Sequence, residues 1–147
     1  MRLLNVAVVA AEPVIVRSIS VVLNRSADRE QFDAHYFTTS VDALDWIRSS
    51  DCDVVITALD MPGIIDGLEL TRAAKHCNPH AQVIVFSAQP TAEQLLELAE
   101  LGASDFVRAP FDKLELREVV EQGIARVRRW EASLRWTRTK QQELALV

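Results

Sequence analysis

The sequence predicts an α/β protein built on a single parallel sheet of five strands. Short apolar runs that are rich in β-branched residues recur at 3–10, 32–37, 53–59, 81–87 and 104–108. Their apolar residues are continuous rather than alternating, which is typical of parallel strands covered on both faces. Segments with helical periodicity separate the runs, and this alternation predicts right-handed βαβ units. We therefore expect a flavodoxin-like, doubly wound sheet with strand order 2-1-3-4-5.

Helix-start signals follow each predicted strand. Proline is favoured at the first helical position, and Ser, Thr and Asp are favoured at the capping position before it. Residues of these types stand at the expected starts: Pro13, Ser40, Asp66, Thr91 and Asp112. Each helix is therefore expected to begin at or immediately after one of these residues.

The last helix is longer than such a domain requires, because no proline or clear terminator follows Lys113 before Val147. Heptad-like spacing predicts a dimer seam along it, formed by Val127, Trp130, Leu134 and Leu144. We divide the chain into a domain at residues 1–123 and a helix extension at 124–147. The extension is expected to form a dimer or to link to an output domain. The alternative is a helix that packs back on its own domain.

Composition excludes several classes of protein. A length of 147 residues fits one domain. Cys52 and Cys77 have no metal-ligand spacing, so we interpret them as reduced thiols. No apolar run approaches the ~18 residues of a membrane span, and no signal peptide is evident. We therefore expect a cytoplasmic protein without membrane contact.

Charge is unevenly distributed. Residues 124–147 hold six cations and two anions, a net +4, which leaves −9 on residues 1–123 of the total −5. A basic tail can indicate nucleic-acid contact, but two glutamates interrupt this one, and no helix-turn-helix pattern follows residue 123. We therefore interpret the tail as a solvated helix face and expect no nucleic-acid partner.

Four segments carry a more specific signal. They are VVAAEP (8–13), CDVVITALDMPGIIDGLELTRAAK (52–75), VIVFSAQ (83–89) and GASDFVRAPFDKLEL (102–116). In order and spacing, they resemble the receiver domain of two-component response regulators. The resemblance covers about residues 3–123 and agrees with the architecture that the strand–helix alternation predicts.

The resemblance implies a phosphoryl-transfer site whose chemical groups are mostly absent here. In the family, an acceptor aspartate and two acids at the end of the first strand hold Mg²⁺, and a lysine neutralises charge. The acceptor position, three residues before the Met-Pro-Gly motif, corresponds to Ala58, and the lysine position corresponds to Ala109. The acidic positions fall on Ala10, Ala11 and Glu12. We therefore expect Mg²⁺ binding to be weak or lost and predict no cofactor.

Two acids remain near this vestigial acidic pocket, which comprises Ala10, Ala11, Glu12 and Asp60. Asp60 lies two residues after the acceptor position and could form a weak carboxylate pair with Glu12. The simpler interpretations are a solvated loop residue for Asp60 and a charge at the helix start for Glu12.

The resemblance also assigns the moving parts of the family's switch. Ser87 matches the switch hydroxyl and Phe106 the switch aromatic, although without a phosphoryl group Ser87 is expected to bond to the backbone. The fourth helix, the fifth strand and the fifth helix form the implied interaction surface, around Phe106, Val107 and Arg108.

The sequence therefore predicts a pseudo-receiver: a module of two-component phosphorelay type that lacks the phosphoacceptor and is not an enzyme. It is expected to act by protein–protein interaction and to form a homodimer through the last helix. One alternative is a phosphoacceptor receiver whose active-site residues were substituted by design. The other is a flavodoxin-like domain that binds a small ligand in the emptied crevice.

Overall fold

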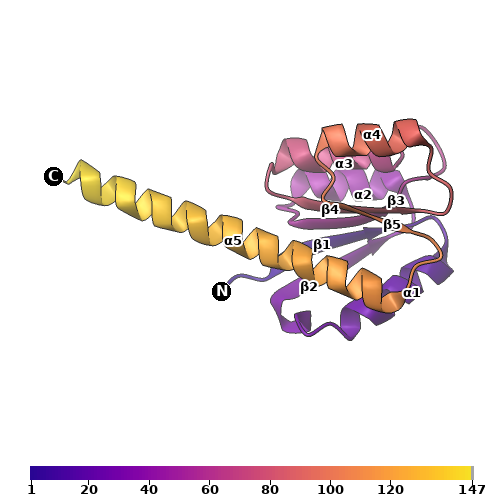
Figure 1. The fold of residues 1–147 in the computed structure, drawn as a ribbon, viewed down its shortest axis with the longest axis horizontal. Helices are drawn as coiled ribbons and strands as arrows, with labels where there is room; N and C mark the ends of the chain where they lie inside the picture. Colours follow the sequence, from indigo (N-terminus) through magenta and orange to yellow (C-terminus); the bar gives the residue numbers. More distant parts are fainter. Residues whose placement is uncertain (147) are drawn as a thin grey trace.

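The computed structural model describes residues 1–146 as a parallel sheet flanked by helices on both faces (Figure 1). The strands are β1 (Leu4–Val9), β2 (Phe32–Phe37), β3 (Val54–Ala58), β4 (Gln82–Ser87) and β5 (Asp105–Arg108). All pairs are parallel, and the order across the sheet is β2-β1-β3-β4-β5. The predicted fold class is confirmed.

Helices connect successive strands and are divided between the two faces. They are α1 (Pro13–Asn24), α2 (Ser40–Ser49), α3 (Gly67–Cys77), α4 (Ala92–Leu101) and α5 (Lys113–Ala145), with a short 3-10 turn at Arg29–Gln31. Helices α2, α3 and α4 cover one face of the sheet, and α1 and α5 cover the other (Figure 1). Among the helices of residues 1–146, none combines the length and apolar character that a membrane crossing needs.

Four of the expected helix starts are confirmed, at Pro13, Asp66, Thr91 and Asp112. The prediction that Ser40 caps α2 is wrong by one position. Thr39 is the capping residue, because its Oγ1 accepts a hydrogen bond from the amide of Asp42 at 3.3 Å. Ser40 is instead the first residue of the helix and is buried.

The apolar core forms two layers separated by the sheet. Side chains alternate along β1, so that Val6 and Val8 pack toward α1 and α5, whereas Ala7 and Val9 pack toward α2, α3 and α4. Both faces of the central strands are therefore covered, which explains why the sequence shows continuous rather than alternating apolar runs.

Helix α5 remains part of the globule beyond residue 123. Ile124 and Val127 are 1% and 3% exposed and pack in the core layer under α1 and α5. The assignment of Val127 to a dimer seam is therefore wrong. Its heptad-like spacing continues the stripe of Leu116 and Val120, which faces the sheet of the same chain.

A polar network fixes the direction in which α5 leaves the globule. The Arg2 guanidinium donates two hydrogen bonds to the carboxylate of Asp53, at 2.7 and 2.9 Å, and a third to Glu131 at 3.3 Å. Asp53 is only 1% exposed, and its carboxylate also accepts a hydrogen bond from the backbone N–H of Asn5 at 2.8 Å. The hydrogen bonds to Asp53 raise the pKa of the Arg2 guanidinium above its ordinary value, so Arg2 stays positively charged.

Arg128 completes this network from α5. It donates to Glu131 at 3.2 Å and to the backbone carbonyl of Arg2 at 2.9 Å. The ring of Trp130 stacks on His80, with centroids 4.4 Å apart. After Glu131 the helix projects away from the sheet, and the extension therefore starts from an anchored base (Figure 1).

Candidate functional site

The carboxyl edge of the sheet brings together most of the positions that the sequence singled out. Ala10 follows β1, Ala58 is the last residue of β3, Ser87 is the last residue of β4, and Ala109 follows β5. Ala58 lies beside Phe86 in the sheet register, and the Ala109 amide donates to the Ser87 carbonyl at 2.9 Å. In an open α/β sheet this edge is where ligands bind.

The alanines at this edge are packing residues. Ala10 is 1% exposed and belongs to the core layer under α1 and α5. Ala11 packs against the opposite layer, and Ala58 touches both layers. Methyl groups therefore fill space at the end of the sheet where the resemblance implies carboxylates.

Ser87 contributes a polar side chain to this edge from the end of β4. Ser87 is 5% exposed, and its hydroxyl donates to the Asp60 carboxylate at 3.1 Å. The expectation that Ser87 bonds to backbone is wrong, because the loop after β3 carries Asp60 across the end of β4. Asp60 itself is exposed, as the interpretation of a solvated loop residue expects.

The remaining acid, Glu12, occupies the capping position of α1 and is exposed. Its side chain makes no capping hydrogen bond to the helix. This position agrees with the interpretation of Glu12 as a charge at a helix start, where the dipole favours an anion.

The donor set at this edge does not fit the Mg²⁺ that the family resemblance implies. Magnesium requires near-octahedral coordination by oxygen, with carboxylates among the ligands. Ala10, Ala11 and Ala58 have no side-chain oxygen. Within residues 1–146, no three His, Cys, Asp or Glu side chains are placed to hold a metal ion.

The start of α3 approaches the end of β3 closely. A Cβ atom on Gly67 would lie 2.5 Å from the Ala58 carbonyl oxygen and 2.7 Å from the Leu59 Cα. Glycine is therefore required at this position of the Asp-Gly motif for packing. This requirement does not depend on any chemistry at residue 58.

The predicted interaction surface is only partly exposed. Phe106 is half-buried and packs toward α2, α3 and α4. Val107 is 0% exposed in the opposite layer, so its assignment to a surface is wrong, because side chains alternate along β5. Arg108 is exposed, and the nearby α4 exposes Leu96 to 67%.

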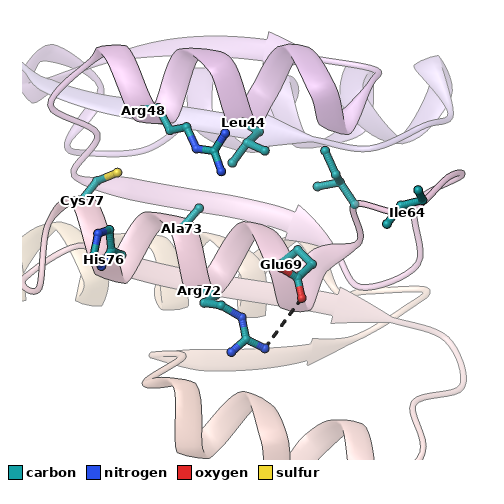
Figure 2. Close-up of a pocket in the computed structure, with 9 residues that line it drawn as sticks. Leu44, Arg48, Ile64, Glu69, Arg72, Ala73, His76 and Cys77 are labelled. Atoms are coloured by element: carbon teal, nitrogen blue, oxygen red, sulfur yellow. Dashed lines mark ion pairs between the residues drawn. The ribbon is translucent and has the colours of Figure 1, made fainter.

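Two features outside the carboxyl edge of the sheet were missed from the sequence. The first is the ion pair of Arg2 with buried Asp53, which an acid at the start of an apolar strand could have signalled, because a buried charge requires a partner. The second is a groove of about 540 Å³ between α2 and α3 (Figure 2). We call it the α2–α3 groove; it is lined by Leu44, Arg48, Ile64, Ile65, Glu69, Arg72, Ala73, His76 and Cys77.

Comparison with known proteins agrees with this architecture. The DNA-binding transcriptional regulator NtrC of Rhizobium meliloti is 30% identical over 112 residues, which are 76% of this chain and 23% of that protein. Sporulation initiation phosphotransferase F of Bacillus subtilis is 28% identical over 104 residues, which are 71% of this chain and 83% of that protein. The chain therefore spans about a quarter of the NtrC relative but most of the Bacillus protein.

A solved structure shows the same fold. The CheY-like response regulator receiver domain protein from Methanospirillum hungatei has a TM-score of 0.77 and 17% identity, over 86% of this chain and 98% of that one. The family model described as the response regulator receiver domain matches residues 6–121. The chain belongs to the response regulator receiver domain family of two-component signalling.

Proposed function

We propose that this chain is a pseudo-receiver, a receiver domain that does not accept a phosphoryl group and is not an enzyme. The observation that carries the proposal is the packing of Ala10, Ala11 and Ala58 into the two core layers at the carboxyl edge of the sheet. A methyl group has no electron pair with which to attack phosphorus, and it cannot ligate Mg²⁺. Ala109 likewise supplies no cation for a developing negative charge.

The role that remains is recognition of other proteins, which receiver domains carry out in phosphorelays. The chain retains the receiver fold and its surface, but alanines stand at the positions of the acids through which that surface would respond to phosphorylation. We assign recognition to the surface formed by α4, β5 and the first half of α5, where Leu96 and Arg108 are exposed. We also propose that the chain acts in the cytoplasm.

Incubation with acetyl phosphate and Mg²⁺ tests the proposal. We expect the intact mass of the chain to remain unchanged, because residue 58 offers no nucleophile. Asp60 is the acid nearest to residue 58 in sequence. An Asp60→Asn variant is the control for phosphorylation at Asp60 itself. A gain of one phosphoryl group on the unaltered chain would contradict the pseudo-receiver assignment.

We further propose that the extension of α5 forms a homodimer. Beyond Glu131 the helix continues for ~20 Å, and all of residues 132–146 are exposed. Leu134 and Leu144 are 37% and 75% exposed on this segment. A second copy of the helix would cover these side chains and stabilise the extension.

Truncation separates the extension from the fold. A chain ending after Glu131 keeps the core residues Ile124 and Val127 and the Arg2 network, so it is expected to remain folded. In analytical ultracentrifugation we expect the full chain to be a dimer and the truncated chain a monomer.

A matched pair of substitutions distinguishes the seam from the extension as a whole. The variant Leu134→Glu, Leu144→Glu should be monomeric, whereas Thr139→Glu, which lies on another face of the helix, should remain dimeric. A monomeric full chain, or a dimer that survives truncation, would contradict the proposed seam.

A further inference from the structure

The α2–α3 groove has an apolar floor and walls that are charged on both sides. Leu44, Ile65 and Ala73 are half-buried and form the floor. Leu44 and Arg48 lie one turn apart on α2, and both side chains extend toward α3 (Figure 2). The volume of about 540 Å³ falls within the range of ~300–1,000 Å³ that is common for small-ligand sites.

The charges of the groove leave one cation uncompensated. Arg72 is balanced, because its guanidinium lies 3.7 Å from Glu69 and 3.5 Å from Glu97. Arg48 makes no ion pair and no side-chain hydrogen bond within residues 1–146, and its guanidinium lies between the two helices (Figure 2). This cation is present although residues 1–123 carry a net charge of −9. Arg48 is therefore the cation of the groove that can pair with an anionic group of a ligand.

The loop between β3 and α3 places an apolar residue at the mouth of the groove. Ile64 is 97% exposed and follows Gly63, whose φ of 91° lies in the left-handed region. Covering part of an exposed isoleucine side chain removes apolar surface from water, so a ligand with an apolar body can use Ile64 as a third wall. Ile64 is also part of the GIIDG sequence (63–67), which leads from β3 into α3.

From these observations we infer that the α2–α3 groove binds a small anionic amphiphile. Its apolar body lies over Leu44 and Ala73 between the helices, and its single carboxylate pairs with Arg48. Ile64 covers the apolar body from the side of the loop. This site is separate from the alanine-filled edge of the sheet, and it does not depend on the pseudo-receiver assignment.

The chain contains a reporter for this site, because Cys77 is an exposed thiol on the groove wall. Cys52, the other cysteine, is buried, and burial raises the pKa of its thiol to about 12, so it stays protonated and unreactive at neutral pH. Alkylation by iodoacetamide, a neutral reagent, therefore reports the accessibility of Cys77. The extent of reaction can be followed by intact mass.

Octanoate is the probe, used below its micellar concentration while circular dichroism confirms that the chain stays folded. We expect octanoate to slow the alkylation of Cys77 at least about fivefold at saturation, with a Kd in the micromolar to millimolar range. Octanamide has the same apolar body without the charge. Its Kd, measured by the same protection of Cys77, should be at least about tenfold higher than that of octanoate, because it lacks the charge-assisted contact.

Two surface variants distinguish the groove from general binding, and neither is expected to disturb folding because both side chains are exposed. Arg48→Glu should raise the Kd for octanoate at least about tenfold, and Ile64→Ser should raise it about threefold. Arg135→Glu makes the same charge change on the extension of α5 and should leave the Kd unchanged. No protection of Cys77 by octanoate, or equal protection in the Arg48→Glu variant, would overturn the inference.

Discussion

Replacing Ala10, Ala11 and Ala58 together with aspartate is expected to lower the free energy of unfolding by ~3 kcal/mol at neutral pH without Mg²⁺. Ala10 is 1% exposed and Ala58 touches both core layers, so the new carboxylates would be partly desolvated. They would also repel one another. Urea unfolding of the variant and the unaltered chain gives the difference.

The stability loss of the aspartate variant should depend on pH and on Mg²⁺ in a defined direction. Burial and mutual repulsion raise the pKa of each new carboxyl above its value in the unfolded chain. The destabilisation should therefore appear as the pH rises through the folded-state pKa and should diminish at acidic pH. Millimolar Mg²⁺ should restore part of the stability of the variant and should not change that of the unaltered chain.

The matched control replaces the same three alanines with asparagine, which has nearly the same size but no charge. The difference between the aspartate and asparagine variants isolates the electrostatic contribution. If the aspartate variant without Mg²⁺ were as stable as the unaltered chain, the alanines would not relieve charge crowding at this edge.

Arg2→Ala is expected to lower the free energy of unfolding by ~2–3 kcal/mol, because it leaves the carboxylate of Asp53 buried without its cation. Removing a partner from a fully buried pair typically costs ~3–5 kcal/mol. Arg2 is 47% exposed, so solvent screening reduces the effect here. The same substitution also removes the contact with Glu131 on α5.

A double-mutant cycle with Asp53→Asn tests the mechanism, since asparagine removes the buried charge. Arg2→Ala should cost less in the Asp53→Asn background than in the unaltered chain. Arg17→Ala serves as the control, because Arg17 is an exposed cation on α1 and lies outside the Arg2 network. Equal costs of Arg2→Ala in both backgrounds would contradict the account of a charge pair.

The fold could be predicted from the sequence because its signals are local. Continuous apolar runs mark strands that are covered on both faces, and capping residues mark most of the helix starts. At α2, Thr39 and Ser40 are adjacent and both residue types can cap a helix, so the sequence does not distinguish the two starts. Val127 fits a dimer seam in the sequence because the spacing of an intramolecular stripe and that of a coiled coil differ little over a few turns.

For the site at the carboxyl edge of the sheet, the sequence predicted which positions converge but not which side-chain contacts they make. Strand ends of a parallel sheet meet at one edge, so the convergence of Ala10, Ala58 and Ala109 followed from the topology. The hydrogen bond between Ser87 and Asp60 did not, because it depends on the path of a loop. An acid at the start of an apolar strand indicates that Asp53 needs a partner, but no local pattern identifies Arg2, 51 positions away, as that partner.

Intact mass measured after incubation with acetyl phosphate and Mg²⁺ tests the central claim most directly when the unaltered chain is compared with a four-site variant. That variant carries Ala10→Asp, Ala11→Asp, Ala58→Asp and Ala109→Lys. We expect the variant to gain one phosphoryl group and the unaltered chain to gain none. Phosphorylation of the unaltered chain would contradict the account. A variant that folds and binds Mg²⁺ yet gains no phosphoryl group would show that more than the four replaced side chains is missing.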